Sequence, residues 1–180
     1  MKSIFFTLCF AIAFAQSQEG NIVPLALGVG VTSYADSEHP YLPETEITPF
    51  IEVDVLDYGH FRLHGTLASI EYSIAEEDFQ KDLLSWGTDL YININPIWKN
   101  PYFTLGYTSR SLLDDSEVGD RKWAEWKVGF GGTWPVRPGL QLFAQGDYRW
   151  SSETVEYEKG VDFNAYKILS LTFGLSAYFY

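Results

Sequence analysis

The chain has 180 residues, with 24 acidic against 12 basic side chains and a formal net charge of −12. This length suits one domain of ordinary size. The strong acidity argues against nucleic acid as a partner, because binding to phosphates needs positive charge.

The first residues have the pattern of an export signal. Residues 1–15 (MKSIFFTLCFAIAFA) combine one lysine, an apolar run and a final Ala-Phe-Ala. This is typical of a secretory signal peptide cleaved before Gln16, and the apolar run is too short for a membrane helix. We expect a leader at 1–15 and one folded domain at 16–180. The single cysteine, Cys9, then leaves with the leader, so the domain has no disulfide. Lipid attachment at Cys9 is a weaker alternative, because bulky Leu8 precedes it.

The segment 166–180 (YKILSLTFGLSAYFY) alternates between apolar and small or polar residues. Its apolar positions are Leu169, Leu171, Phe173, Leu175, Ala177 and Phe179. A period of two predicts a strand with one apolar face. The ending resembles the terminal strand of bacterial outer-membrane proteins, in which Thr172, Gly174 and Phe179 fit the usual polar, glycine and aromatic positions and Tyr180 adds one residue. The resemblance implies that the barrel assembly machinery reads this segment as an assembly signal.

Seven earlier segments alternate in the same way, with all their charged residues on one face. They are 23–32, 47–55, 61–67, 86–95, 103–110, 124–134 and 140–150. Eight strands of about ten residues can cross a thin bilayer at a tilt. We therefore predict an all-β, eight-stranded antiparallel up-and-down transmembrane β-barrel in the bacterial outer membrane. A soluble sandwich or lipocalin-like barrel, with its apolar face inward, is the alternative.

The connections between these segments alternate in length. Three are short: 57–59, 96–100 and 135–139. Four are long and acidic: 35–46, 73–85, 111–121 and 151–165. This predicts short periplasmic turns and long acidic extracellular loops. The loop carboxylates could bind divalent cations, but no EF-hand spacing is present and a solvated, self-repelling rim is favoured. We predict no metal and no cofactor.

Aromatic residues fall near both ends of the segments, as membrane-interface girdles do. Near the short turns these are Trp98, Phe103, Trp134 and Phe179; near the long loops they are Tyr34, Trp86, Tyr107, Trp123, Trp150 and Tyr166.

The charged faces of the segments predict a network of ion pairs inside the barrel. In an antiparallel hairpin the residue numbers of opposite partners have a constant sum. With turns about 135–139 and Tyr58, this rule predicts Lys127–Asp147, Glu125–Arg149, Asp54–Arg62 and Glu52–His64, with Asp89 near Arg110. Eight strands leave an interior only wide enough for side chains, and buried charges there must be paired. The interior is thus predicted to be plugged, which argues against a narrow channel for small solutes.

A lipid A-modifying membrane enzyme is a further alternative. It needs a nucleophile and a histidine base, and the histidines are expected in a loop (His39), at a short turn (His60) and in the lumen (His64). No His-x-Ser motif resembling the lipid A deacylases is present. The prediction is therefore a non-enzymatic protein.

The segment 25–65 (LALGVGVTSYADSEHPYLPETEITPFIEVDVLDYGHFRLHG) resembles the start of the MipA/OmpV family, with a Gly-rich strand, an acidic loop and a Pro-containing strand before an aromatic turn. The segment 143–180 resembles that family's last hairpin. Size and layout are similar to the OmpX and OmpA barrels. The MipA/OmpV resemblance implies a scaffold role with a peptidoglycan-associated protein. The expected partners are otherwise outer-membrane lipid, lipopolysaccharide and the barrel assembly machinery, and the protein is expected to be a monomer.

Overall fold

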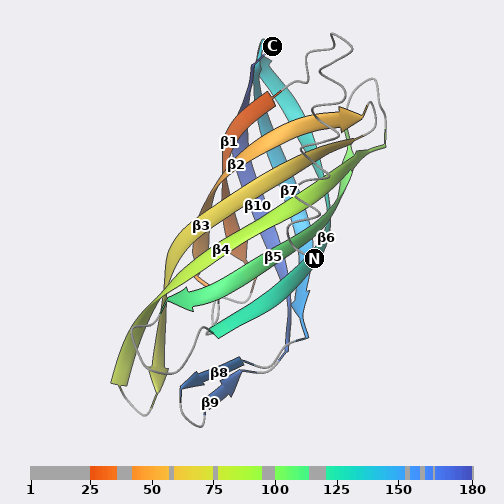
Figure 1. Ribbon diagram of the computed structural model, residues 1–180. Helices are drawn as coiled ribbons and strands as arrows, with labels where there is room; N and C mark the ends of the chain where they lie inside the picture. The colour runs from red at the N-terminus through yellow and green to blue at the C-terminus, as the bar shows by residue number, and fades with distance from the viewer. Residues whose placement is uncertain are drawn as a thin grey trace.

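Eight long strands form one closed barrel in the computed structural model (Figure 1). The structure describes residues 25–35, 42–56, 59–74, 77–94, 100–113, 121–152, 155–158, 161–163 and 165–179. The barrel strands are β1 (Leu25–Tyr34), β2 (Thr45–Leu56), β3 (Gly59–Ile74), β4 (Glu77–Asn93), β5 (Tyr102–Leu113), β6 (Arg121–Arg137), β7 (Leu140–Ser151) and β10 (Tyr166–Phe179). Every neighbouring pair is antiparallel, and β1 closes the barrel against β10.

The alternation of residue types decides which side of each strand faces outward. In β10, Leu169, Leu171 and Phe173 are 60%, 56% and 59% exposed, whereas Ser170 and Thr172 between them are buried. The same holds around the barrel, where apolar side chains form a continuous outer belt and polar side chains fill the interior. This is the reverse of a soluble barrel. The predicted fold class is confirmed, and the soluble alternative is wrong.

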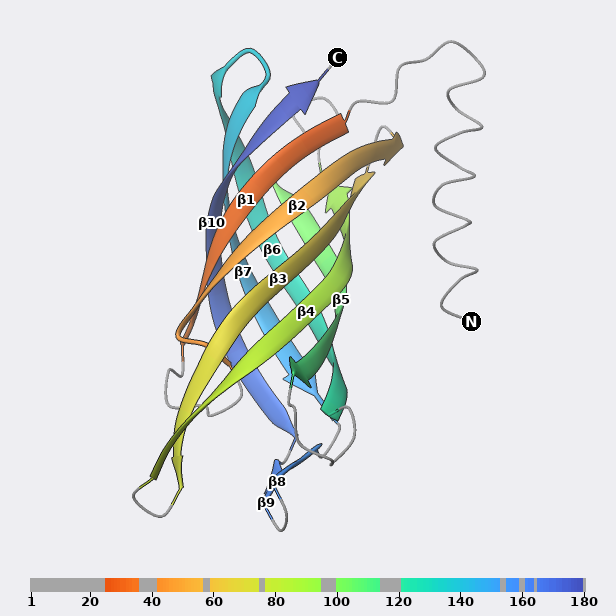
Figure 2. The same cartoon turned by 60° about the vertical axis from the view of Figure 1, so that its left-hand side comes forward.

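The hairpin of β3 and β4 is longer than the sequence pattern predicts. Its pairing continues from Gly59↔Ile92 to Ile74↔Glu77, so most of the expected loop 73–85 is strand. Figure 2 shows this hairpin projecting beyond the other strands of the barrel wall at the long-loop end. Ser69 Oγ donates a hydrogen bond to Asp82 Oδ1 at 2.8 Å, which helps to hold the two strands together there.

Two further connections also differ from the prediction. The long connection between β7 and β10 contains a small antiparallel hairpin of its own, β8 (Val155–Glu158) and β9 (Val161–Phe163). The short turn between β6 and β7 is tighter than expected, because β6 continues to Arg137. Gly139 in this turn has φ of 74°, which favours glycine, and its carbonyl accepts a hydrogen bond from Tyr178 N–H at 2.7 Å.

The predicted leader at 1–15 lies outside the described residues, as do 36–41, 75–76, 114–120, 153–154, 159–160 and 164 of the predicted acidic loops. Within the described residues, no helix is long and apolar enough to span a membrane.

Candidate functional site

The charged side chains on the inward faces of the middle part of the barrel lie in three layers between the long-loop end and the short-turn end. The upper layer, nearest the long loops, contains Glu46, Arg110, Glu125, Asp147 and Arg149. The middle layer contains His64, Asp89 and Lys127. The lower layer, nearest the short turns, contains Glu52, Asp54, His60 and Arg62. Burying so many charges is tolerable only if each is compensated by a close partner.

Arg110 is the centre of the upper layer and has no exposed surface. Its Nε donates to Glu125 Oε2 and its Nη2 to Glu46 Oε2, both at 3.2 Å. Nη1 donates to Ser85 Oγ at 3.1 Å, and Nη2 also donates to Tyr34 OH at 3.0 Å. These partners come from strands on different sides of the barrel, so the guanidinium spans the lumen.

Arg149 extends the upper layer along β7. Its Nη1 donates to Glu125 Oε1 at 3.0 Å, and its Nη2 lies 3.4 Å from Asp147 Oδ2. Its Nε donates to Ser170 Oγ of β10 at 2.7 Å. Glu125 is thus shared by two arginines and also accepts a hydrogen bond from Tyr166 OH at 2.6 Å. Such charge-assisted bonds are stronger than neutral ones.

The middle layer is built on Asp89. Lys127 Nζ donates to Asp89 Oδ2 at 2.9 Å, and His64 Nε2 lies 3.5 Å from Asp89 Oδ1. The second distance is too long for a good hydrogen bond. A cavity of about 30 Å³ adjoins His64, Asp89 and Thr108. It has room for about two water molecules.

The lower layer holds the Arg62 guanidinium between aromatic rings. Its Cζ lies 3.9 Å from the ring centroid of Phe50, 4.5 Å from that of Tyr91 and 4.4 Å from that of Phe143. Its Nε and Nη2 both donate to Glu52 Oε2, at 3.1 and 2.9 Å. Cation–π contacts of this kind stabilise a desolvated guanidinium.

Two glycines leave room for the rings around Arg62. A Cβ on Gly28 would lie 2.2 Å from Phe50 Cζ, and one on Gly174 would lie 2.4 Å from Phe143 Cε1. Both contacts are too short for real atoms, so any side chain there would displace a ring. The inward-facing glycines therefore serve packing of a crowded lumen, as their place in the sequence pattern suggests.

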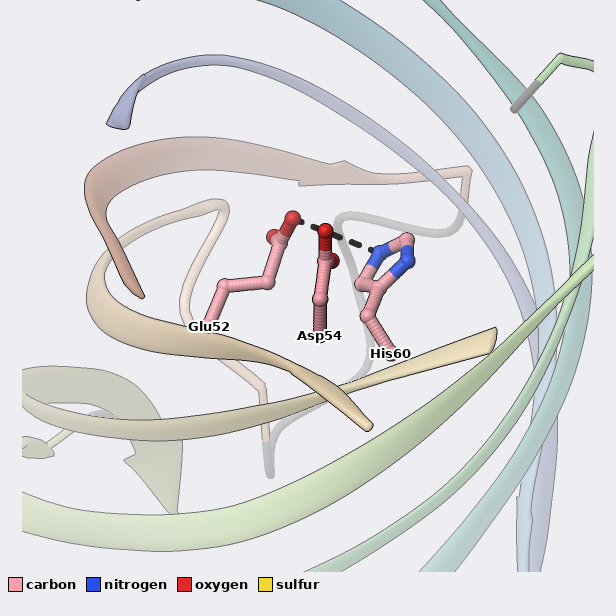
Figure 3. Close-up of side chains that lie close together, drawn as sticks. All are labelled: Glu52, Asp54 and His60. Carbon is pink, nitrogen blue, oxygen red and sulfur yellow. Dashed lines mark ion pairs between the residues drawn. The ribbon is translucent and has the colours of Figure 1, made fainter. Parts of the chain in front are cut away.

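Beside Arg62, three potential metal ligands converge on the short-turn end of the lumen: Glu52, Asp54 and His60 (Figure 3). Glu52 and Asp54 come from β2 and His60 from the start of β3, directly across the turn. His60 Nε2 lies 3.4 Å from Glu52 Oε1, and Tyr178 OH from the closing strand donates to the same oxygen at 2.5 Å.

An apolar cluster lies above the upper layer, at the long-loop end. Its members are Tyr34, Leu42, Ile70, Leu83, Leu112, Trp123, Tyr166 and Ile168, all buried. Trp123 Nε1 donates to Tyr166 OH at 3.3 Å, which ties this cluster to the charged layer below. Three of the aromatic residues expected in the outer girdle (Tyr34, Trp123 and Tyr166) therefore lie inside the barrel. They occupy positions whose side chains point into the barrel. The girdle prediction used only the position along each strand and not the face, so it placed them wrongly.

The structure places all ten predicted lumen residues on the inward side, but it changes their partners. On β6 and β7, Lys127 pairs with Arg149 and Gly129 with Asp147, so the predicted Lys127–Asp147 pair is wrong. Glu125 and Arg149 do form an ion pair, diagonally rather than directly opposite. Two features together move the register by two residues: the turn lies at 138–139, further along the chain than predicted, so that Arg137 is opposite Leu140, and the ladder shifts by one residue at an irregularity between Pro135 and Arg137.

The other predicted pairs are also rearranged. Glu52 lies opposite Arg62 and Asp54 opposite His60, because Leu56 pairs with Gly59 at the turn and the ladder shifts by a further residue between Asp54 and Leu56. The predicted Asp54–Arg62 and Glu52–His64 pairings are therefore wrong. Asp89 lies opposite Gly106 and Arg110 opposite Ser85, so the predicted proximity of Asp89 and Arg110 is wrong as well.

Sequence reasoning missed two charged members of the network, Glu46 and His60. Glu46 was expected in a loop, yet it lies in β2 and binds Arg110. The signal was present, since Glu46 is an even number of residues before Glu52 and therefore shares its inward phase. His60 was expected at a periplasmic turn, but β3 begins one residue earlier, at Gly59.

Of the predicted assembly signal, Thr172 faces inward and its Oγ1 lies 2.9 Å from Thr32 Oγ1. Gly174 faces Phe143, and Phe179 faces outward, 55% exposed. Tyr180 lies outside the described residues. These positions suit a closing strand, and recognition by an assembly machinery stays a prediction.

Solved structures of small outer-membrane barrels have the same fold. Neisserial surface protein A superposes with a TM-score of 0.55 at 16% identity, over 87% of this chain and 97% of that one. OprG from Pseudomonas aeruginosa gives 0.54 at 10% identity, over 88% and 95%. A major outer-membrane protein from Thermus thermophilus gives 0.53 at 12% identity, over 88% and 100%.

The comparisons with sequences give no such likeness. No family model and no curated protein sequence matches the chain, so membership of the MipA/OmpV family is not shown. The fold and the apolar outer belt nevertheless both indicate a barrel that spans a membrane. The chain is a small eight-stranded β-barrel of the bacterial outer membrane, with its apolar face toward lipid and a salt-bridged interior.

Proposed function

We propose that this protein is a non-enzymatic outer-membrane barrel whose plugged lumen is structural and whose role is to support the envelope or to bind partners through its ends. The observation that carries the proposal is Arg110, fully buried and bound to carboxylates from two other strands, β2 and β6. A side chain held in this way blocks the axis of the barrel.

A narrow channel for small solutes is the alternative that the interior argues against. An ion or solute would have to break charge-assisted hydrogen bonds in the upper layer and displace Arg62 from its aromatic rings in the lower one. Removing one partner of a buried ion pair lowers the stability of a protein by roughly 3–5 kcal/mol, because the other charge is left uncompensated. Thermal opening of all three layers together is therefore rare.

A lipid A-modifying enzyme is the other alternative. Such an enzyme needs its catalytic groups on the lipid-facing surface, where the substrate lies. Both described histidines are inside the barrel, His60 beside Glu52 and His64 beside Asp89. The two histidines lie beside carboxylates inside the lumen, where lipid cannot reach them.

Conductance in planar lipid bilayers tests the plugged lumen. We expect the full chain, folded and inserted, to give no reproducible single-channel steps. The double variant Arg110→Ala with Glu125→Ala, which removes the centre of the upper layer, serves as the positive control for an opened interior. Regular steps from the unmodified protein would contradict the proposal.

Crosslinking of cell envelopes followed by purification of the protein tests the interaction role. The resemblance to the MipA/OmpV family suggests a peptidoglycan-associated protein as the partner, joined at the short-turn end. We expect a crosslinked product that depends on this face and survives removal of the long loops. Recovery of lipopolysaccharide and assembly factors alone would contradict the scaffold role with a peptidoglycan-associated protein. Structural support of the envelope would then remain as the proposed role.

A further inference from the structure

The lower layer of the lumen holds a group of side chains whose close approach is not explained by the Arg62–Glu52 ion pair alone. We propose that Glu52, Asp54 and His60 form a binding site for a divalent transition-metal ion, of which zinc fits best, at the short-turn mouth of the barrel. One ligand atom from each residue lies within 4.8 Å of the other two, and Figure 3 shows the three side chains converging. The inference goes beyond the proposed function and does not depend on it.

The spacing of two of the ligand atoms already matches a metal site. His60 Nε2 and Glu52 Oε1 are 3.4 Å apart. Zinc binds nitrogen and carboxylate oxygen at about 2.0–2.2 Å in tetrahedral geometry, which places two ligand atoms roughly 3.4 Å from each other. A carboxylate oxygen of Asp54, within 4.8 Å of both atoms, is the third potential ligand. An imidazole with two carboxylates is a donor set typical of zinc and related ions.

Neighbouring residues orient the ligands as the outer shell of a metal site does. Arg62 holds Glu52 through Oε2 with two hydrogen bonds, which turns Oε1 toward His60. The His60 ring is stacked on Tyr91, with centroids 4.5 Å apart and planes at 8°, so its direction is fixed. Tyr178 OH donates to Glu52 Oε1 and can keep this bond to a metal-bound carboxylate, because such carboxylates are commonly hydrogen-bonded.

The charge balance of the interior favours a cation at this position. Among the described residues, the three layers contain six carboxylates (Glu46, Glu52, Asp54, Asp89, Glu125 and Asp147) and four permanent cations (Arg62, Arg110, Lys127 and Arg149). The carboxylates therefore exceed the permanent cations by two charges, which His60 and His64 balance only when they are protonated, and buried charge is stable only when it is compensated. A divalent ion held by Glu52, Asp54 and His60 supplies those two positive charges.

The position also allows a metal ion to enter and to stabilise the barrel. Asp54 is partly exposed, whereas Glu52 and His60 are buried, so the site opens toward the short-turn side. Bound metal would join β2 to β3, and Tyr178 would connect this hairpin to the closing strand β10. Metal binding to the folded state alone raises its stability by mass action.

Calorimetric titration of zinc chloride into the untagged chain, folded in detergent and freed of metal by EDTA, tests the proposal. We expect one equivalent to bind, with at least a tenfold weaker affinity in His60→Gln and in Asp54→Asn. The matched control is His64→Gln, which changes a lumen histidine outside the cluster and should leave the affinity unchanged. Absence of binding by the unmodified chain, or equal losses in all three variants, would overturn the site.

X-ray absorption of the zinc-loaded unmodified chain gives a second test that needs no variant. We expect one imidazole nitrogen in the first shell, with oxygen ligands completing it. A shell of oxygen atoms alone, or one with two or more imidazoles, would place the ion elsewhere and refute the assignment. This measurement decides the question even if a variant fails to fold.

Discussion

Lys127 on β6 binds Asp89 on β4 across the whole width of β5, with Nζ 2.9 Å from Oδ2. The two residues lie in one row of the barrel with Gly106 between them, since Asp89 pairs with Gly106 and Gly106 with Lys127. A Cβ on Gly106 would lie 2.3 Å from Asp89 Oδ1 and 2.4 Å from Lys127 Cε. The missing side chain is therefore what lets the ion pair form over the intervening strand.

The first prediction concerns this glycine. Gly106→Ala should force Lys127 and Asp89 apart and lower the free energy of unfolding by about 1–3 kcal/mol, the usual cost of overpacking. The measurement is urea-induced unfolding in lipid vesicles. Gly146→Ala is the control, because Gly146 faces outward and the nearest atom to its added Cβ would be Leu171 Cδ2, at 3.7 Å, an ordinary contact distance. Equal effects of the two substitutions would show that the Lys127–Asp89 row does not depend on Gly106.

The sequence pattern predicts the side of each strand better than it predicts the partners. Successive side chains alternate between faces, so a register shift of two residues leaves every residue on its original side. The turn at 138–139 and the irregularity near Val136 together cause such a shift between β6 and β7. Lys127 therefore stays in the lumen, as predicted, but faces Arg149 instead of Asp147. A bulge has no reliable signature in a single sequence, whereas the period of two is repeated in every strand.

The contacts across the lumen were beyond sequence reasoning for a different reason. A hairpin rule reaches only strands that are neighbours in the chain, whereas Arg110 on β5 binds Glu46 on β2. That contact depends on how far the barrel is staggered when it closes. Glu46 itself could have been found, because it shares the inward phase of Glu52. Its assignment to an acidic loop came from the charge of its neighbours in sequence rather than from the alternation.

The second prediction concerns Arg110. Arg110→Met should lower the free energy of unfolding by about 3–5 kcal/mol, because it leaves Glu46 and one side of Glu125 buried without their cation. Unfolding in vesicles measures the effect. The double variant Arg110→Met with Glu46→Gln should recover part of the loss, since it removes one of the stranded charges.

The size of that recovery distinguishes a direct contact from a general loss of packing. Contacting charged residues show interaction energies of about 0.5–3 kcal/mol in double-mutant cycles. If the losses from Arg110→Met and Glu46→Gln simply add, then the pair does not couple as its 3.2 Å contact implies.

The third prediction concerns Arg62. Arg62→Lys keeps the charge beside Glu52 but loses the planar guanidinium that lies against Phe50, Tyr91 and Phe143. Lysine does not replace arginine at a stacked, two-bonded site. We expect the free energy of unfolding to fall by about 1–2 kcal/mol, because the variant loses at least one hydrogen bond to the charged carboxylate of Glu52. Urea-induced unfolding in lipid vesicles measures it, and a lysine variant as stable as the unmodified protein would indicate that charge alone holds the lower layer.

The fourth prediction tests which face meets the lipid. Leu171 lies in the middle of β10, on the outward side, and is 56% exposed. Leu171→Arg should destabilise the barrel by about 2–4 kcal/mol in lipid vesicles, because an arginine there is forced into the hydrocarbon layer. The control is Ser152→Arg, an exposed position just beyond the end of β7, where the added charge reaches water. In a soluble protein both positions would tolerate arginine equally well, since an exposed charge costs little in water. A large loss at Leu171 with none at Ser152 therefore requires that the apolar belt is in contact with acyl chains, and equal tolerance at the two positions would contradict a membrane-spanning barrel.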